Sequence, residues 1–279
     1  MDLLVETDMQ TYVLSNLGVF VKDVKTSSPS IDISSTSINF KNGKLFSGAT
    51  YGEKTITVTG SYYVEDEYAD QEMQDKLNFL FARVEPFYIS QMFRSGDQYD
   101  YERPGESTGS TLDNQQDPLT YHYRYKVLIS DNIDYDFQGK SGAGLLTNIS
   151  LEFKTVDIPY GMTLPEDEVL TGARAIPYSG TADVSQLEWP FYFVLMSTQL
   201  QGNSFTFKVG DDVFTYTSDV AIKQGDVFEL KGTSFLLNGL NVNDRTNIQY
   251  FKLRAQQESV IETDFIGEVE LKNKIAFYV

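Results

Sequence analysis

The sequence contains no cysteine and only one histidine. Structural disulfides and thiolate metal sites are therefore excluded, and the usual zinc site lacks the histidine or cysteine ligands that it needs. Long apolar runs are missing as well, because no segment approaches the roughly 18 apolar residues of a membrane helix. The first residues, Met1 to Asp8, do not resemble a signal peptide. We therefore expect a protein that folds in the cytosol without membrane insertion.

Basic residues are scarce: 22 Lys and Arg stand against 40 Asp and Glu, which gives a net charge of −18. An acidic surface repels phosphate, so we expect no sequence-specific nucleic-acid binding. The chain is 41% hydrophobic and 14% aromatic, a composition typical of folded domains. Its many Tyr and Phe residues favour β-structure.

Sequence signals for catalysis are weak. The single histidine, His122, has no nucleophile motif around it. Gly139-Lys140-Ser141 resembles the end of a P-loop, but the first glycine of that motif would have to stand where Asp134 does. An EF-hand loop that began at Asp134 would end at Leu145 instead of glutamate. We predict that the chain is not an enzyme and has no catalytic residue, cofactor or metal site.

Most of the chain reads as short strands separated by turn residues. The segment 31–40 alternates isoleucine with polar residues and ends at the turn signal Asn42-Gly43. The longest alternation covers 121–129 and places His122 on the polar face. One stretch has helical spacing instead, about 66–84, with Asp66 as the expected N-cap. We expect this amphipathic helix to pack on a sheet.

The segment 95–120 is polar and contains almost no aliphatic residue. A connection of this length tends to be either functional or disordered. We consider two alternatives, a plain surface loop and a loop that a neighbouring subunit orders. In the second case the candidate inter-subunit contacts are Arg94, Tyr99, Tyr101 and Arg103.

The second half is expected to form a separate β-sandwich. A proline, two glycines and acidic residues at 161–175 indicate a linker between domains at 1–160 and 176–279. Strand-like runs then recur from 187 to 278, and they include Leu187–Met196, Ser204–Val209, Phe235–Leu237 and Ile248–Leu253. Trp189 shares its parity with Leu187 and Phe191, which favours core packing over a sugar-stacking platform.

The order of these features resembles the distal tail proteins of siphophages that infect Gram-positive bacteria. The resemblance is strongest over 48–90, where a turn (48–52) and a β-branched strand (54–60) precede the helix ending at Phe81 and the segment Glu85–Ile89. It continues through the strand 149–153 into Pro159-Tyr160-Gly161, and more weakly through 225–239.

The resemblance implies a mainly β-protein, with an N-terminal sandwich or split-barrel ring domain that carries one helix, followed by a galectin-like β-sandwich. It implies a homo-hexamer, possibly two stacked rings, at the distal tail tip of the virion, assembled in the bacterial cytoplasm. The ring would let DNA pass, and its partners would be the tail tube protein, a tail-associated or tip protein, and receptor-binding or baseplate proteins. The alternatives are a carbohydrate-binding accessory protein, a calcium-stabilised adhesin and, third, an enzyme.

Overall fold

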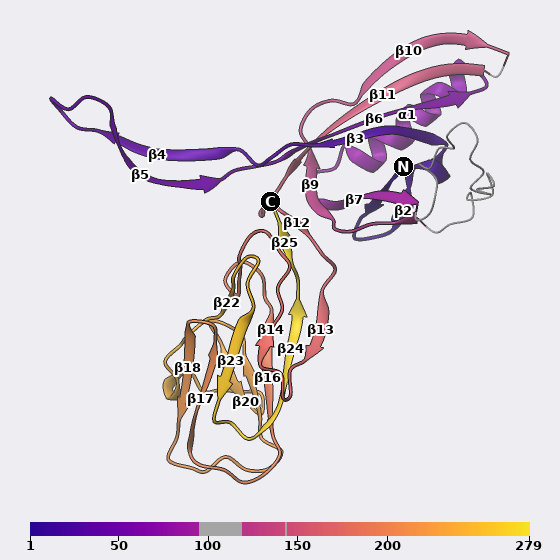
Figure 1. Cartoon of the computed structure of the whole chain (residues 1–279). Helices are drawn as coiled ribbons and strands as arrows, with labels where there is room; N and C mark the ends of the chain where they lie inside the picture. Colours follow the sequence, from indigo (N-terminus) through magenta and orange to yellow (C-terminus); the bar gives the residue numbers. More distant parts are fainter. Residues whose placement is uncertain (95–118, 143) are drawn as a thin grey trace, which may run out of the picture. The chain divides into compact units, whose positions relative to one another are not determined.

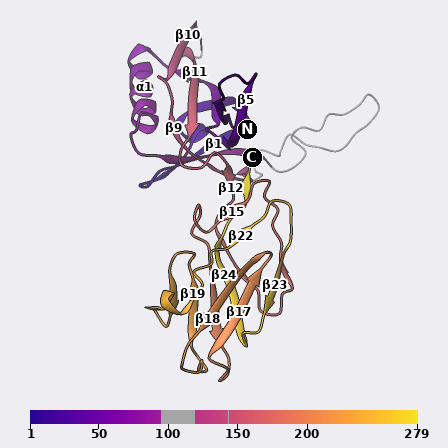
Figure 2. The same cartoon turned by 90° about the vertical axis from the view of Figure 1, so that its left-hand side faces the viewer.

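The computed structural model describes residues 1–94, 119–142 and 144–279. The chain divides into two compact units, unit 1 (Met1–Gly161) and unit 2 (Met162–Val279). Figures 1 and 2 show that strands dominate both units. Within the described residues, no helix is long and apolar enough to cross a membrane.

In its described residues, unit 1 contains one α-helix and a large antiparallel sheet. The sheet follows the order β2-β1-β7-β9-β11-β6-β3, with β10 paired to β11 and β8 paired to β7, while β4 and β5 form a separate two-stranded sheet. The elements are β1 (Asp2–Glu6), β2 (Thr11–Val13), a 3₁₀ turn (Leu14–Leu17), β3 (Val19–Thr26), β4 (Ile31–Ser37), β5 (Lys44–Tyr51), β6 (Thr55–Val64), α1 (Glu67–Phe81), β7 (Phe87–Arg94), β8 (Leu119–Thr120), β9 (Tyr125–Ile129), β10 (Asp134–Ser141) and β11 (Gly144–Thr155).

The sheet of unit 1 curls around a single core. Strand β11 alternates buried and more exposed residues along its twelve positions, as a strand with one core face must. Val5 of β1 and Val21 of β3 lie at opposite ends of the strand order, yet both belong to the same buried cluster. The two ends of the sheet therefore close over shared side chains, which agrees with the expected mainly β fold with one packed helix.

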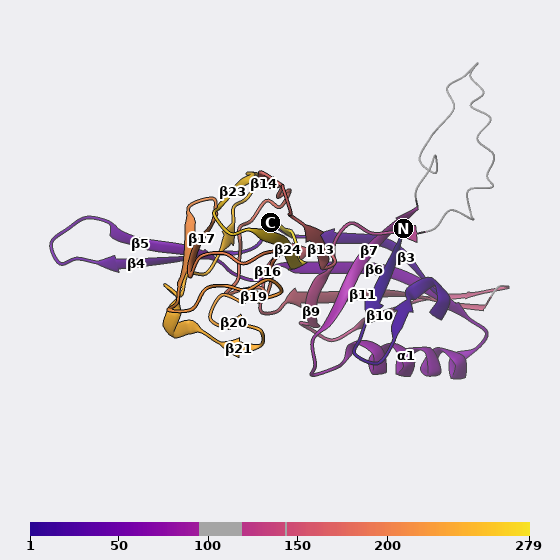
Figure 3. The same ribbon diagram turned by 90° about the horizontal axis from the view of Figure 1, so that it is seen from below.

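Helix α1 lies along the sheet (Figures 1 and 3) and confirms the predicted helix, although it ends at Phe81. The Asp66 side chain caps it by accepting a 2.9 Å hydrogen bond from the amide of Ala69. Asp70 ties the helix to the sheet, because its carboxylate accepts hydrogen bonds from the hydroxyls of Tyr62 (2.8 Å) and Thr147 (3.1 Å). Burial and the neighbouring Asp70 raise the pKa of Tyr62 well above its usual value.

The predicted strand 121–129 is shorter than the alternation suggested. Strand β9 begins at Tyr125, and His122 lies on an exposed bend before it, 5.2 Å from the Tyr123 ring. Tyr125 belongs to the buried core of unit 1 and Tyr123 packs against that core, and the two rings meet edge to face at 5.5 Å.

Unit 2 consists of two main sheets with short strand pairs at its margin. The larger sheet has the order β13-β24-β16-β19-β20-β21 and the smaller one β14-β23-β17-β18, with the pairs β12-β25 and β15-β22 beside them. Their bounds are β12 (Gly161–Met162), β13 (Glu166–Val169), β14 (Ala175–Ile176), β15 (Val184–Ser185), β16 (Tyr192–Ser197), β17 (Ser204–Val209), β18 (Asp212–Thr217), β19 (Val227–Leu230), β20 (Phe235–Leu237), β21 (Leu240–Asn241), β22 (Lys252–Leu253), β23 (Ser259–Thr263), β24 (Gly267–Lys274) and β25 (Phe277–Tyr278).

Aromatic rings hold the two sheets of unit 2 together. Phe193 of the larger sheet and Phe207 of the smaller one meet with ring centroids 5.1 Å apart, and both lie within about 6 Å of the Phe251 ring. A second group joins Phe205 to Phe228 at 4.9 Å. These edge-to-face contacts add specific geometry to the burial of large apolar area.

Three predictions for the second half need correction. Strand β16 begins at Tyr192, so Leu187 lies outside it and is 56% exposed. Trp189 is therefore half-buried at the margin, where its indole N–H donates to the backbone oxygen of Asn273 (2.8 Å). The run 248–253 contains only the two-residue strand β22, because Ile248 has a φ of 52°, which an extended strand cannot contain. The linker at 161–175 stays a prediction, and strands β12 and β13 lie within that segment.

Candidate functional site

The predicted inter-subunit residues mostly fall outside what the structure describes. Tyr99, Tyr101 and Arg103 lie in the segment 95–118, which is not among the described residues. Arg94 ends strand β7, and its backbone alone is described. The geometry of that candidate contact is therefore left as predicted.

A different segment stands out in unit 1, namely the hairpin of β4 and β5, residues 31–51, which we call the arm. It forms its own two-stranded sheet and extends beyond the large sheet (Figures 1 and 3). Every residue of β4 is exposed, and so is every residue of β5 except Gly48. Isolated two-stranded hairpins are marginally stable in water, so an exposed arm of this kind indicates a surface for another protein.

The arm has one apolar face. Ile31 pairs with Tyr51 and Ile33 with Ala49, and directly paired residues share a face. A bulge between Ser34 and Ser35 shifts the register, which brings Phe46 onto the same face opposite Ser35. Ile33 is 66% and Phe46 64% exposed. The opposite face carries small polar residues, with Leu45 as its apolar exception.

The tip of the arm is built by the predicted Asn42-Gly43 turn. Gly43 has a φ of 82°, a conformation that glycine adopts without steric cost. Phe40 also has positive φ (64°), and its side chain is fully exposed. Lys41 and Lys44 flank the turn. The tip therefore presents one aromatic ring and two amino groups to solvent.

The root of the arm is fixed more firmly. The amide of Gly52 donates to the oxygen of Ser30 (2.8 Å), and a Cβ at Gly52 would stand 2.3 Å from the Ser30 hydroxyl. Beside it, Lys154 pairs with Glu53 at 2.6 Å. Lys54 is buried next to this root, and burial lowers the pKa of its amino group. A side chain at position 52 would have to displace the Ser30 hydroxyl, so the root of the arm is closely packed around this glycine.

The signal for the arm was present in the sequence, although we interpreted it as an ordinary strand of a sheet. Ile31 and Ile33 alternate with polar residues, which is typical of a half-buried strand. Four of the residues between Asp32 and Ile38 are serine or threonine, and no large apolar residue occupies the second face of β4. Alternation shows that one face is apolar, but it does not show which molecule covers that face.

The face of the large sheet away from its core is polar where β6, β10 and β11 pair. Asp134, Ser150 and Thr59 form one row across the three strands, and Asp136, Asn148 and Ser61 form the next. Lys22 donates to the Asn148 side chain at 2.6 Å. A shallow hollow of about 270 Å³ lies over these residues. This face offers hydroxyl, amide and carboxylate groups, and the exposed ring of Phe20, which pairs with Ser61, lies beside them.

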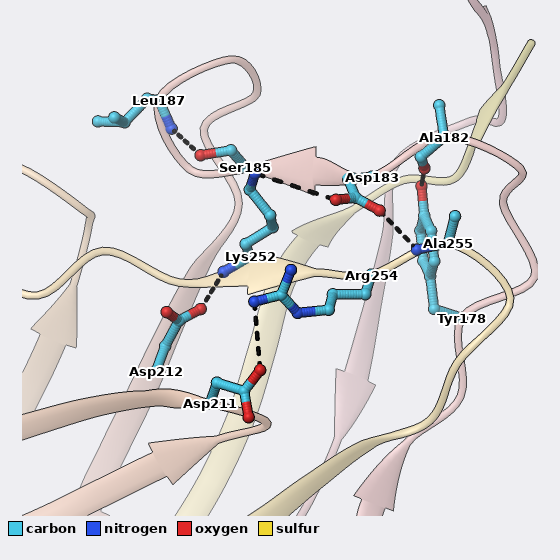
Figure 4. Close-up of polar contacts among 10 residues, drawn as sticks. All are labelled: Tyr178, Ala182, Asp183, Ser185, Leu187, Asp211, Asp212, Lys252, Arg254 and Ala255. Carbon is cyan, nitrogen blue, oxygen red and sulfur yellow. Dashed lines mark hydrogen bonds and ion pairs between the residues drawn. The ribbon is translucent and has the colours of Figure 1, made fainter.

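Unit 2 carries a network of polar contacts (Figure 4). Arg254 pairs with Asp211 at 3.2 Å, and Asp212 accepts from the Lys252 amide at 2.9 Å. A hollow of about 310 Å³ beside this network is lined by Lys208, Lys252 and Arg254, each within 4 Å of a carboxylate. Their charges are thus compensated within the fold, and we assign the network to holding the turns of unit 2.

Sites for metal or acid–base chemistry do not emerge from the described parts of the chain. There, no group of three or more His, Asp or Glu residues is placed to hold a metal ion. Asp134 and Asp136 lie on strand β10, and Gly139 forms a bulge in that strand with a φ of 136°. The P-loop-like and EF-hand-like segments are therefore parts of a β-hairpin.

Comparisons with known proteins agree with this fold. The crystal structure of SPP1 Dit (gp 19.1), described as a paradigm of hub adsorption apparatus in phages that infect Gram-positive bacteria, matches with a TM-score of 0.64. It is 12% identical, and the match covers 98% of each chain. A chain of the phage P2 baseplate in its activated conformation with Ca matches at a TM-score of 0.41 and 10% identity, over 99% of this chain and 97% of that one. No curated protein sequence matched significantly.

The sequence itself carries a family domain. The family model described as "Phage tail protein RIFT-related domain" matches residues 7–154, more than half of the chain, and these residues include the arm, α1 and most of the large sheet. This chain belongs to that family of phage tail proteins.

Proposed function

We propose that the chain is the structural hub subunit of a siphophage tail tip. In this proposal unit 1 assembles into a hexameric ring, or two stacked rings, that joins the tail tube to the baseplate or receptor-binding apparatus. The observation that carries it is the arm: an amphipathic hairpin whose apolar residues Ile33 and Phe46 are each about two-thirds exposed. The match to a structure named as a hub of the adsorption apparatus supports the role.

A closed ring requires two different surfaces on each subunit, one that reaches out and one that receives. The arm supplies the first of these. Burial of a large apolar side chain stabilises an interface by about 2 kcal/mol, so two such residues can change an association constant by several hundredfold. The predicted contacts Arg94, Tyr99, Tyr101 and Arg103 remain part of the proposal, as a second connection between neighbours.

The polar face of the large sheet would line the lumen in this proposal. The carboxylates of Asp134 and Asp136 on this face repel the phosphate groups of DNA, and its hydroxyl groups offer no apolar surface on which DNA bases could stack. Such a wall would let DNA pass without retaining it. Unit 2, with the galectin-like sandwich proposed for 176–279, would then serve the tip, receptor-binding or baseplate proteins. Assembly would take place in the bacterial cytoplasm, and the finished ring would reside at the distal end of the virion tail.

The carbohydrate-binding alternative receives no support from Trp189. Its indole N–H is already used by the Asn273 backbone, and its ring is half-buried. We therefore do not propose it as a second function.

The mass of the purified protein in solution tests the proposal. Sedimentation over a range of concentrations should show hexamers or double hexamers, and negative-stain images should show rings. Ile33→Ser with Phe46→Ser should weaken assembly by about a hundredfold or more, since both side chains leave the apolar face. Leu240→Ser is the matched control, because Leu240 is also exposed but lies in unit 2. A monomer at every concentration, without rings, would refute the proposal.

A further inference from the structure

Helix α1 has an outward face with two exposed aromatic rings. Tyr68 is 76% and Phe79 79% exposed, whereas Leu77, Leu80 and Phe81 point into the core. Tyr68 and Phe79 are eleven positions apart, about three helical turns, so they lie on one side of the helix about 16 Å apart. Two exposed rings on the solvent side of an otherwise packed helix indicate a contact surface.

Acidic side chains fill the space between these rings. Glu72 and Asp75 are exposed, and neither forms an ion pair with any described residue. Asp66 and Asp70 differ from them, because Asp66 caps the helix and Asp70 binds Tyr62 and Thr147. Asp66 and Asp70 therefore form hydrogen bonds within the fold, whereas Glu72 and Asp75 face solvent beside the aromatic rings.

The arm has the opposite character. Residues 31–51 contain two lysines and one aspartate, a net charge of +1 in a chain whose net charge is −18. Lys41 and Lys44 form no ion pair with the described residues, and both adjoin the exposed Phe40 at the tip. The tip of the arm and the outward face of α1 are thus complementary in two respects. Each carries exposed aromatic rings, and the lysines of the tip are opposite in charge to the acidic residues of the helix.

The tip of the arm does not lie against α1 of the same chain. In Figures 1 and 3 the tip extends from one end of the large sheet, while α1 lies along the sheet toward its other end. Strand β5 has eight residues and spans about 26 Å, longer than the roughly 16 Å between Tyr68 and Phe79. The arm is therefore long enough to lie across the whole aromatic and acidic face of another molecule.

We propose that the tip of the arm docks on the outward face of α1 in a second copy of this chain. Phe40 packs against Phe79 and Tyr68, and Lys41 and Lys44 pair with Glu72 and Asp75. This inference rests on the proposed ring, and it specifies which surface of the neighbour receives the arm. The two surfaces differ, so each copy both gives and receives a contact, as a closed ring requires.

Charge exchange tests the docking. Lys41→Glu with Lys44→Glu should weaken assembly about tenfold, and Glu72→Lys with Asp75→Lys should do the same, because each pair of substitutions replaces attraction by repulsion. The variant that carries all four substitutions should recover assembly to near the original level. Lys140→Glu on the β10–β11 hairpin and Glu258→Lys in unit 2 serve as charge-matched controls and should leave assembly unchanged.

A second measurement does not depend on charge reversal. A zero-length carbodiimide coupling should join Lys41 or Lys44 to Glu72 or Asp75, and mixing isotope-labelled with unlabelled protein should show that the link joins two copies. Phe79→Ser should weaken assembly about tenfold with no fall in the melting temperature of the monomer, since Phe79 is exposed.

The outcomes separate the two proposals. If substitutions in the arm weaken assembly but the four-fold variant is not rescued and the cross-links reach other peptides, the helix is not the receiving surface and the proposed ring stands. If rings form equally well with the whole arm deleted, this inference fails together with the role given to the arm. Rescue by charge exchange with cross-links between Lys41 or Lys44 and α1 would establish the docking.

Discussion

Unit 2 buries all ten of its phenylalanines, whereas unit 1 buries three of its nine. The six exposed ones lie on several elements of unit 1: Phe20, Phe40, Phe46, Phe79, Phe93 and Phe137. Scattered exposed apolar residues are normal on protein surfaces, but an imbalance this strong between two units of similar size is not. Unit 2 completes its core within itself, whereas unit 1 leaves six phenylalanine rings on its surface. In the proposed function, this difference would separate a self-contained module from an assembling one.

The largest expected effect concerns the core of unit 2. Phe207→Ala removes a ring that contacts both Phe193 and Phe251, and it should lower the free energy of unfolding of unit 2 by about 3–5 kcal/mol. Two-state chemical denaturation of the fragment 162–279 measures this value. The matched substitution in unit 1, Phe46→Ala, should leave the unfolding of the monomer nearly unchanged. Equal losses of stability from Phe207→Ala and Phe46→Ala would contradict the difference between the two units.

A smaller effect is expected at the link between α1 and the sheet. Asp70→Ala leaves the buried hydroxyls of Tyr62 and Thr147 without their acceptor, which should cost unit 1 about 2 kcal/mol. Glu72→Ala on the exposed side of the same helix is the control and should change stability by no more than about 0.5 kcal/mol. Thermal melts of the two variants decide between a structural and a purely superficial role for Asp70.

The pH dependence of the two units should differ in the alkaline range. Burial raises the pKa values of Tyr62 and Tyr125 in unit 1 far above 10.0, and that of Tyr178 in unit 2 to about 12. Because each folded-state pKa is raised, the stabilisation is complete below the unfolded value of 10.0 and is lost as pH rises above it. Unit 1 should lose more stability than unit 2. Melting curves on either side of pH 10 test this, and Tyr62→Phe should reduce the slope.

The smallest effect is expected in the polar network of unit 2. Arg254 and Asp211 are largely exposed, and an exposed ion pair contributes about 1 kcal/mol or less. Arg254→Gln should therefore shift the melt of unit 2 only slightly, with an even smaller shift at high salt. A loss comparable to that of Phe207→Ala would mean that polar contacts, and not the aromatic core, hold the sheets together.

The sequence allowed good predictions where the local pattern decides the structure. Helix α1 was predicted because its apolar spacing and the Asp66 cap are both local, and β17 (Ser204–Val209) and β20 (Phe235–Leu237) were predicted to the residue. In β17 the alternation of apolar and polar residues coincides with the alternation of buried and more exposed ones, and neighbouring strands pair on both of its edges.

Other elements were not predicted, because contacts between residues far apart in the sequence define them. Strands β14 and β15 are two residues long and exist only through their partners in β23 and β22. Leu187 shares the parity of Phe191, but a turn separates them, and the amide of Trp189 bonds back to the oxygen of Ser185 (2.9 Å). The sequence of the arm predicted an alternating strand that ends at the Asn42-Gly43 turn, but not that the hairpin would form a separate sheet. The parity of a residue in the sequence shows which face of a strand it occupies, but only the fold shows which residues or molecules cover that face.

The pairing of β12 with β25 makes unit 2 suitable for protein engineering. These strands are the first and the last of the unit, and they are hydrogen-bonded to each other, with the amide of Thr163 donating to the oxygen of Ala276 (3.1 Å). The entrance and exit of the unit therefore lie side by side, as in domains that tolerate circular permutation and insertion. Another module with adjacent ends could replace residues 162–279, and a reporter fused after Val279 would emerge beside the point where unit 2 begins.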